Sequence, residues 1–199
     1  MKRITCLAFG TALATASLAA PAKSLTYTVD AHHSFPLFEI HHMGYSTFRG
    51  RFEGVSGKIT LDDDKHSGSA EIHIDVKSVS TGVKKLDDEL TAQDFFDAGK
   101  YPEIVFKSRK FKFDGDTLKS VEGKLTMHGV TRPVTLDVAS FHCATHPMLQ
   151  VPACGADASV TIKRSDWGLT KWINYNVSDE VKLELEVEAQ AVKGGGGRP

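Results

Sequence analysis

Apolar and charged residues alternate without interruption along residues 181–188. The apolar positions are Val181, Leu183, Leu185 and Val187, and the charged positions between them are Lys182, Glu184, Glu186 and Glu188. Successive side chains of a β-strand point to opposite faces. This period of two therefore predicts a strand that is buried on one face and solvated on the other.

The same pattern recurs at intervals of roughly 10–20 residues, as expected for an antiparallel sheet. The predicted strands cover residues 25–29, 38–42, 48–52, 55–61, 71–76, 104–106 continuing to 111–113, 119–127, 133–141, 156–163 and 181–188. A sheet with one apolar face must bury that face, and a short chain can do so by closing into a barrel. We therefore predict an all-β fold, an antiparallel eight-stranded barrel whose last strand pairs with its first.

One segment between the strands changes to a helical period. Val83, Leu86 and Leu90 have the spacing of one helix face, and Ser80 or Thr81 can serve as the N-cap. We expect this helical insertion to cover one end of the barrel.

A further helical turn is expected directly after this helix. Thr91 and Asp94 have the spacing of a capping pair, and the turn would end at Phe95 and Phe96 before Gly99 stops it. The turn would add aromatic side chains to the covered end of the barrel.

The apolar pattern also predicts one irregularity within a strand. Positions 104 and 106 have one parity and positions 111 and 113 the other, which indicates a β-bulge between Ser108 and Lys110. Asp114-Gly115 then has the sequence of a tight hairpin turn.

The first 22 residues have the features of an export signal. Lys2 and Arg3 precede a mostly apolar segment at 4–18, and Ala20-Pro21-Ala22 is an A-x-A cleavage motif. We expect a signal peptide at 1–22, one barrel domain at 23–190 and a flexible glycine-rich tail at 191–199. The mature protein would then be periplasmic.

Charge argues against one class of partner. The chain has 24 basic and 25 acidic residues, and two of the basic ones lie in the predicted signal, which leaves 22 and a net charge near −3. Nucleic-acid-binding proteins usually carry a basic surplus, so we expect no nucleic-acid partner.

Cleavage of the signal would remove Cys6 and leave Cys143 and Cys154. A pair of cysteines in an exported protein predicts a disulfide, which here would close a loop of 12 residues. A metal site is the alternative, because His142 and His146 lie beside Cys143. The oxidising compartment favours the disulfide.

The nine histidines raise the question of a metal centre. Adjacent residues of a strand point to opposite faces, so the pairs His32-His33 and His41-His42 could bring at most two ligands together. The sequence has no H-E-x-x-H helix, no spaced Cys/His quartet, no G-x-S-x-G elbow and no phosphate-binding glycine loop. We therefore expect no metal, no cofactor and no catalytic residues.

Aromatic residues occur near predicted strand ends and in the helical insertion, where a closed core would not need them. They are Phe48, Phe52, Phe95, Phe96, Phe106, Trp167 and Trp172. An eight-stranded barrel can be filled by its own side chains or can hold a ligand, and periodicity does not distinguish the two.

Four segments of the chain stand out when taken in order. They are HMGYSTFRGRF at 42–52, DFFD at 94–97 with KYP at 100–102 and FKS at 106–108, LTMHGVTRPV at 125–134, and SDWG at 165–168 with SDEV at 178–181. In this order and spacing they resemble the YceI-like family of exported polyisoprenoid-binding proteins. The resemblance runs from about Tyr27 to Ala189 and implies a lipocalin-like barrel.

The resemblance further implies that the barrel holds a long isoprenoid tail, such as that of a quinone or a polyprenyl lipid. The expected tail contacts are Phe38, Ile40, Ile72, Ile74, Phe106, Leu125, Met127, Leu136, Val160 and Leu183, supported at the mouth by Leu90, Phe95, Phe96 and Trp167. For the head group we consider His42, Arg49, Asp94 and Arg132. A structural role is the alternative for these four, with Arg49 and Asp94 paired across the rim or Asp94 acting as a helix cap.

The leading hypothesis is a non-catalytic periplasmic protein that carries or stores an isoprenoid lipid, with transient contact to a membrane or a membrane protein. The first alternative is a metal-dependent or other enzyme at the barrel mouth that uses His42, His128 and a carboxylate. The second is an interaction module with a solid core. The sequence leaves the oligomeric state open between monomer and homodimer.

Overall fold

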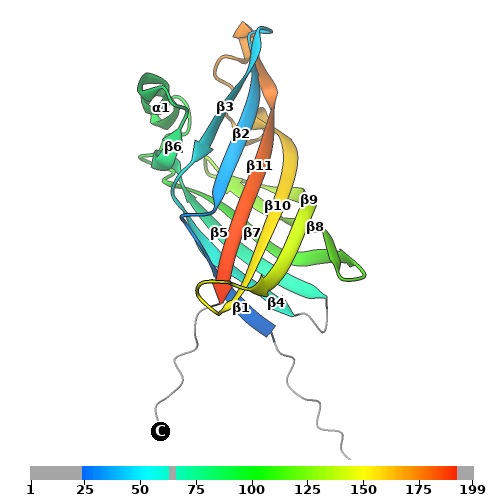
Figure 1. Ribbon diagram of the computed structural model, residues 1–199. Coiled ribbons are helices and arrows are strands. Elements are labelled where there is room, and N and C mark those ends of the chain that lie inside the picture. The colour runs from blue at the N-terminus through cyan, green and yellow to red at the C-terminus, as the bar shows by residue number, and fades with distance from the viewer. Residues whose placement is uncertain (1–23, 63–65, 192–199) are drawn as a thin grey trace, which may run out of the picture.

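The computed structural model describes residues 24–62 and 66–191 (Figure 1). The predicted signal peptide at 1–22 lies outside the described residues, as do residues 192–199 of the predicted tail. Ala191, which we assigned to that tail, is the last residue of a strand.

The described residues form an antiparallel sheet of eleven strands with a few short helical elements. The strands are β1 (Ser24–Val29), β2 (Phe35–His42), β3 (Ser46–Phe52), β4 (Val55–Asp62), β5 (Ser67–Asp75), β6 (Val79–Ser80), β7 (Glu103–Asp114), β8 (Thr117–Met127), β9 (Val130–Thr145), β10 (Pro152–Lys163) and β11 (Val177–Ala191). The helical elements are α1 (Lys84–Thr91) and the 3-10 turns η1 (Val76–Ser78), η2 (Arg164–Trp167) and η3 (Ile173–Tyr175).

The sheet closes into the predicted eight-stranded barrel. Its order is β1-β4-β5-β7-β8-β9-β10-β11, and β11 returns to β1 with Tyr27 opposite Ala191 and Val29 opposite Ala189. The expected pairing of the last strand with the first is therefore confirmed.

The long strand β11 has two partners on the same side. Its final residues pair with β1, and its earlier part pairs with β2, where Val181 lies opposite Ile40 and Leu183 opposite Phe38. Strands β3 and β6 follow β2 in the sheet, so three strands extend the wall beyond the closed ring.

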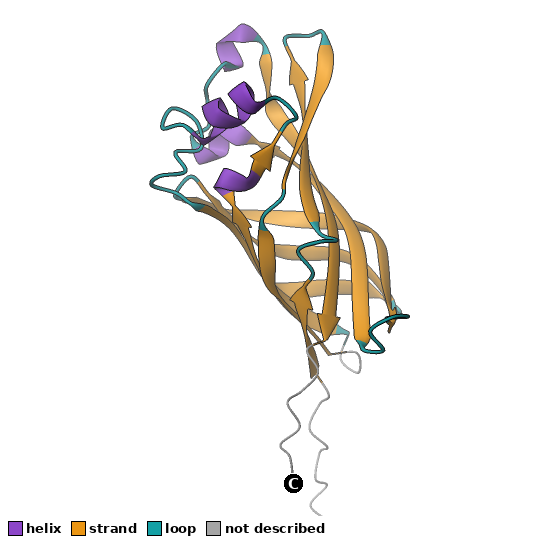
Figure 2. Ribbon diagram, turned by 60° about the vertical axis from the view of Figure 1, so that its left-hand side comes forward, coloured by secondary structure: helices purple, strands orange, loops and turns teal. Residues whose placement is uncertain are grey.

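The helical elements gather at one end of the barrel, as Figure 2 shows, and we call this the helical end. The helix α1 spans nearly the predicted residues, but its N-cap is Val83, not Ser80 or Thr81. Thr81 stabilises the residues just before the helix. Its hydroxyl oxygen accepts a hydrogen bond from the Val83 amide at 3.2 Å, and the same hydroxyl donates to the Asp87 carboxylate.

A further turn does follow the helix and ends at Phe96, since residues 93–96 form a turn in which the Phe95 amide donates to the Ala92 carbonyl at 3.1 Å. The predicted Thr91 cap is wrong, because the Thr91 hydroxyl donates back to the carbonyls of Asp87 and Asp88. The Phe96 amide bonds back to the Leu90 carbonyl at 3.0 Å, and both Phe95 and Phe96 border the barrel cavity.

The predicted bulge and hairpin are both present. The β7–β8 register shifts between Ser108 and Lys110, and the Ser108 hydroxyl fills the irregularity by donating to the Glu122 carbonyl. Strands β7 and β8 are joined at Gly115, whose φ of +56° suits glycine.

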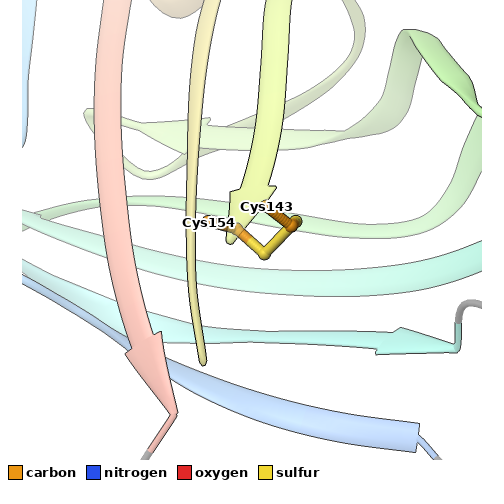
Figure 3. The surroundings of a disulfide bond; sticks show 2 residues. All are labelled: Cys143 and Cys154. Atoms are coloured by element: carbon orange, nitrogen blue, oxygen red, sulfur yellow. A yellow bond between two sulfur atoms is a disulfide. The ribbon is translucent and has the colours of Figure 1, made fainter. Parts of the chain in front are cut away.

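The two cysteines of the barrel form the predicted disulfide (Figure 3). Cys143 on β9 and Cys154 on β10 are direct partners across the two strands. His146 lies in the connecting loop, where its Nδ1 atom is 3.2 Å from the amide nitrogens of both Met148 and Leu149. That ring therefore organises the loop.

None of the described helices is long and apolar enough to cross a membrane.

Candidate functional site

The barrel encloses a cavity of about 340 Å³. Its lining runs from residues beside the helical end, such as His42 and Trp172, to residues beside the disulfide, such as Phe141 and Cys154. Nearly all the lining side chains are apolar. The barrel therefore contains an internal cavity. The alternative of a solid core filled by the barrel's own side chains does not hold.

Several inward-facing apolar side chains are only partly buried. Phe38, Ile40, Ile72, Val160 and Leu183 pack against the core and border the cavity, yet none is fully covered by protein. Apolar side chains that face the interior of a domain are normally packed to high density. Here these side chains border the cavity instead, so a slender apolar ligand in the cavity would bury surface that folding leaves accessible.

A row of aromatic rings crosses the helical end of the cavity. Ring centroids lie 6.1 Å apart for Phe38–Phe52 and 5.9 Å for Phe52–Phe96. The row continues at 5.2 Å for Phe95–Phe96 and 5.6 Å for Phe95–Trp172. It links β2 and β3 to the 92–98 segment and then to the η2–η3 loop, and all five rings border the cavity.

Two glycines allow phenylalanine rings to lie flat along the inner wall. A Cβ at Gly50 would fall 2.4 Å from the Phe38 ring, and a Cβ at Gly123 would fall 2.6 Å from the Phe106 ring. Each glycine lies on a strand next to its phenylalanine. A side chain at either glycine would collide with the neighbouring phenylalanine ring, so glycine leaves room for that ring beside the wall.

A buried arginine organises the loop at the helical end. Arg164 is 3% exposed, and its Nε donates to the Ser178 carbonyl at 2.9 Å. Nη1 donates to the carbonyls of Leu169 and Lys171 at 2.7 and 2.8 Å, and Nη2 to that of Val177 at 3.1 Å. Burial lowers the pKa of the guanidinium, and the charge of Asp179 acts in the opposite direction.

Asp179 ties the same loop to the sheet. The β11 register shifts between Val177 and Val181, so Asp179 lies in an irregular stretch, and its carboxylate accepts from the Ser165 amide at 2.9 Å and the Ser165 hydroxyl at 2.7 Å. Burial raises the pKa of Asp179, but these hydrogen bonds outweigh it, and the pKa lies below its ordinary value. The SDWG and SDEV segments of the sequence thus meet in space.

The structure places most of the predicted ligand-contact residues on the cavity wall. They are Phe38, Ile40, His42, Ile72, Ile74, Leu90, Phe95, Phe96, Phe106, Leu125, Met127, Leu136, Val160 and Leu183. The side-chain alternation of the strands is what brings them to one surface.

Four predicted residues do not border the cavity, and two of them are the head-group candidates Arg49 and Asp94. Arg49 is paired with Glu39, its direct partner on β2, because residue 49 has the outward parity opposite to Phe48. Asp94 is instead bonded to Lys171, which lowers the pKa of Asp94. The alternative in which Arg49 and Asp94 pair with each other across the rim is therefore wrong, and each has a different ionic partner.

The other two contact or belong to the η2 turn. Arg132 has the inward parity of Val134 and Leu136 on β9, but its side chain is exposed, and its Nε donates to the Asp166 carbonyl at 3.2 Å. Trp167 is 2% exposed and its indole donates to the Leu125 carbonyl at 3.2 Å, so it braces η2 against β8 from outside the lumen.

The predicted ligand contacts omitted some residues that border the cavity. Arg164 and Phe111 are two of them, and Phe48, Phe52 and Trp172 were named from the sequence only as aromatic residues that a closed core would not need. The phenylalanines follow from strand parity. Arg164 and Trp172 lie in irregular segments where no periodicity applies, and Trp172 has a φ of +65°.

The two histidines of the enzyme alternative have separate surroundings. His42 borders the cavity beside Phe48, whereas the His128 ring packs on Tyr101 and its Nδ1 lies 3.1 Å from the Trp167 carbonyl. Within residues 24–62 and 66–191, no group of three His, Cys, Asp or Glu side chains is placed to hold a metal ion.

Comparison with known families matches residues 27–189 to the YceI-like domain. The chain belongs to the YceI-like family. Its relatives include a UPF0312 protein of Pseudomonas paraeruginosa, 35% identical over 94% of this chain and 96% of the relative. A UPF0312 protein of Pseudomonas putida is 34% identical over 96% of this chain and 97% of the relative.

Several solved structures have a similar fold. Burkholderia cenocepacia BcnA is similar with a TM-score of 0.69 and 28% identity, covering 80% of this chain and 98% of BcnA. The Campylobacter jejuni YceI protein has a TM-score of 0.65 and 29% identity over 77% of this chain and 91% of that protein. A polyisoprenoid-binding domain from Saccharophagus degradans, at 20% identity and a TM-score of 0.64 over 84% and 99%, shares the fold.

Proposed function

We propose that this YceI-like protein is a non-catalytic binding protein that holds a long isoprenoid lipid, a polyprenyl or quinone tail, inside the barrel for transport or storage. The observation that carries the proposal is the apolar cavity of about 340 Å³ whose inward side chains stay partly accessible. A volume of this order lies within the range of about 300–1,000 Å³ common for ligand pockets. The polyisoprenoid-binding relative of the same fold supports the ligand class.

The energetics favour a long tail over a small ligand. Each methylene-sized unit moved from water into the lumen contributes about 0.8 kcal/mol, so about 15 units contribute roughly 12 kcal/mol before costs. Association and ordering cost about 4–15 kcal/mol. Useful affinity therefore needs a long or branched hydrocarbon chain and a preformed cavity. The barrel supplies the preformed cavity.

We further propose that the protein acts in the periplasm. The N-terminal segment with its A-x-A motif and the disulfide between Cys143 and Cys154 both suit an exported protein. A lipid carrier in this compartment would meet a membrane or a membrane protein transiently to load and release its cargo.

The test is to purify the protein from the periplasm of its producing cells, extract it with organic solvent and identify the bound lipid by mass spectrometry. We expect an isoprenoid lipid at near one per chain. Stoichiometric zinc or iron without lipid, or an empty protein that also fails to take up added prenyl lipids, would contradict the proposal.

A matched pair of variants tests whether the lipid occupies the lumen. Ala158 lies on the cavity wall between Val138 on β9 and Leu185 on β11, which also border the cavity. Ala158→Trp fills the space and should abolish lipid retention. Thr161→Trp adds the same side chain to an exposed position of the same strand and should retain the lipid. Equal retention by folded samples of both variants would place the lipid elsewhere.

A further inference from the structure

The cavity ends before the barrel does at the end that carries the disulfide. A small cluster of buried residues lies there, separate from the larger core, and we call it the floor cluster. It comprises Tyr27, Leu61, Ala189 and Ala191. Tyr27 and Leu61 are each 4% exposed and border the cavity, whereas Ala191 belongs to the same cluster but does not border it. The lumen is therefore closed at this end by packed side chains.

Two phenylalanines lie at the boundary between the lumen and the floor cluster. Phe111 and Phe141 each pack against both the larger core and the floor cluster, and both border the cavity. Phe141 on β9 lies opposite Ala156 on β10, and the disulfide from Cys143 to Cys154 joins the same two strands two residues farther along. The two rings therefore mark the end of the cavity, beside a cross-linked part of the wall.

The bulge of β7 is what turns Phe111 into the lumen. Phe106 borders the cavity before the bulge, and Phe111 borders it after the bulge, opposite Val121 on β8. Without the extra residue of the bulge, position 111 would have the outward parity. Gly68 leaves room for the ring, because a Cβ there would fall 2.8 Å from it. The fold thus places this ring at the end of the cavity through two specific local features.

The helical end of the barrel is closed in a different way. Strand β3 pairs with β6 only at Arg51 and Phe52, so among the described residues positions 46–50 of β3 pair with β2 alone. From there to the 92–98 segment the contact is between the rings of Phe52 and Phe96, whose centroids are 5.9 Å apart. Such a contact opens by side-chain rotation, without loss of backbone hydrogen bonds. The helical end is therefore the easier route into the lumen.

We propose that Phe111 and Phe141 form an end stop that sets the longest isoprenoid tail the barrel accepts. The inference rests on the proposed function. The tail enters at the helical end, and its tip reaches the two rings. Any isoprene unit beyond the available length stays in water at the helical end. Burial of apolar surface drives binding, so each such unit makes the barrel less favourable for the lipid than a membrane.

The experiment offers delipidated protein an equimolar mixture of prenyl alcohols of increasing tail length in phosphatidylcholine vesicles. The protein is separated from the vesicles, and the bound alcohols are extracted and quantified by mass spectrometry. Wild type should take up tails to a definite limit. The bound amount should fall at least about tenfold at the first isoprene unit beyond that limit.

Truncation of either ring should raise the limit. A phenyl ring is slightly larger than an isoprene unit, and an apolar space left by truncation can hold an apolar guest. Phe111→Ala and Phe141→Ala should each extend the accepted tail by about one unit. Phe113→Ala is the matched control, because the Phe113 ring lies 6.3 Å from that of Phe141 but does not border the cavity. It should leave the limit unchanged.

The variant Ala156→Leu tests the opposite direction. It adds a side chain to the cavity wall opposite Phe141 and should shorten the accepted tail by about one unit. In wild type, which needs no substitution, a prenyl alcohol with a photoreactive diazirine at the tail tip should label the surroundings of Phe111 and Phe141.

Two results overturn this inference alone. One is a tail limit that stays the same in every folded variant, and the other is diazirine labelling confined to the 92–98 segment. Failure of wild type to take up a prenyl alcohol of any length overturns the proposed function as well.

Discussion

Ser34 and Glu188 are joined by two hydrogen bonds at the point where β11 changes partner. The Ser34 hydroxyl donates to the Glu188 carbonyl at 3.0 Å and accepts from the Glu188 amide at 2.9 Å. The Asp30 amide also donates to the Glu188 carbonyl, at 2.9 Å. The fully buried Ser34 thus supplies hydrogen bonds to the Glu188 backbone at a position where β11 pairs with neither β1 nor β2.

The variant Ser34→Ala should lower the free energy of unfolding by roughly 1–3 kcal/mol. It leaves the part-buried amide of Glu188 without its acceptor, and an unsatisfied polar group away from water carries a cost of that order. Urea unfolding followed by fluorescence measures the change. Ser56→Ala, at an exposed position of β4, is the control and should stay within about 0.5 kcal/mol of wild type. A Ser34 variant as stable as this control would contradict the role.

Strand alternation was sufficient to predict the closed barrel and most of its inner wall. Phe38 and Ile40 point inward because they share a parity, and the bulge at Ser108–Lys110 followed from a change of parity along β7. Such inferences succeed because a one-residue shift would move every apolar side chain of a strand into water.

The polar residues of the site could not be predicted in the same way. Arg49 and Asp94 were chosen for charge and position near the rim, yet each forms an ion pair with a partly buried residue of another segment, Glu39 and Lys171 respectively. Arg164 was missed because its burial depends on four carbonyls from residues 169–178, an arrangement that only the folded loop creates. Long-range hydrogen bonding of this kind leaves no period in the sequence.

The disulfide should stabilise the end of the barrel opposite the helices. Cross-linking Cys143 to Cys154 closes a short loop in the unfolded chain, which contributes about 2–4 kcal/mol in typical cases. The double variant Cys143→Ser with Cys154→Ser should lose stability of that order, measured by urea unfolding without reductant. Reductant should reduce the stability of wild type toward that of the variant and leave the variant unchanged. Free thiols found by intact-mass analysis of unreduced, alkylated protein would show that the bond does not form.

The Asp179–Ser165 contact should make stability depend on pH in one direction. The pKa of Asp179 is lower in the folded protein than its ordinary value, because the hydrogen bonds from Ser165 favour the carboxylate over the opposing effect of burial. The folded state therefore gains stability from Asp179 at neutral pH. That gain is lost as the pH falls below about 4 and through the lowered pKa.

The variant Asp179→Asn tests this sign. It should be less stable than wild type at pH 7, and the difference should shrink as the pH is lowered below about 4. Urea unfolding of both proteins across this range measures it, with Glu180→Gln as the control for loss of an exposed charge in the same irregular stretch. A deficit that grows on acidification would mean that the hydrogen bonds do not favour the charged form.

The aromatic row at the helical end should control how fast lipid leaves the barrel. Phe96 contacts Phe52 and Phe95, and it joins the 92–98 segment to the strand wall. Phe96→Ala removes the middle of the row and should raise the dissociation rate of a bound prenyl lipid by about tenfold, equivalent to about 1.4 kcal/mol. Transfer of a fluorescent prenyl lipid to excess vesicles measures the rate. Tyr175→Ala, which removes an exposed ring from η3, should leave the rate unchanged. If Phe96→Ala and wild type release lipid at the same rate, the lipid leaves by another route.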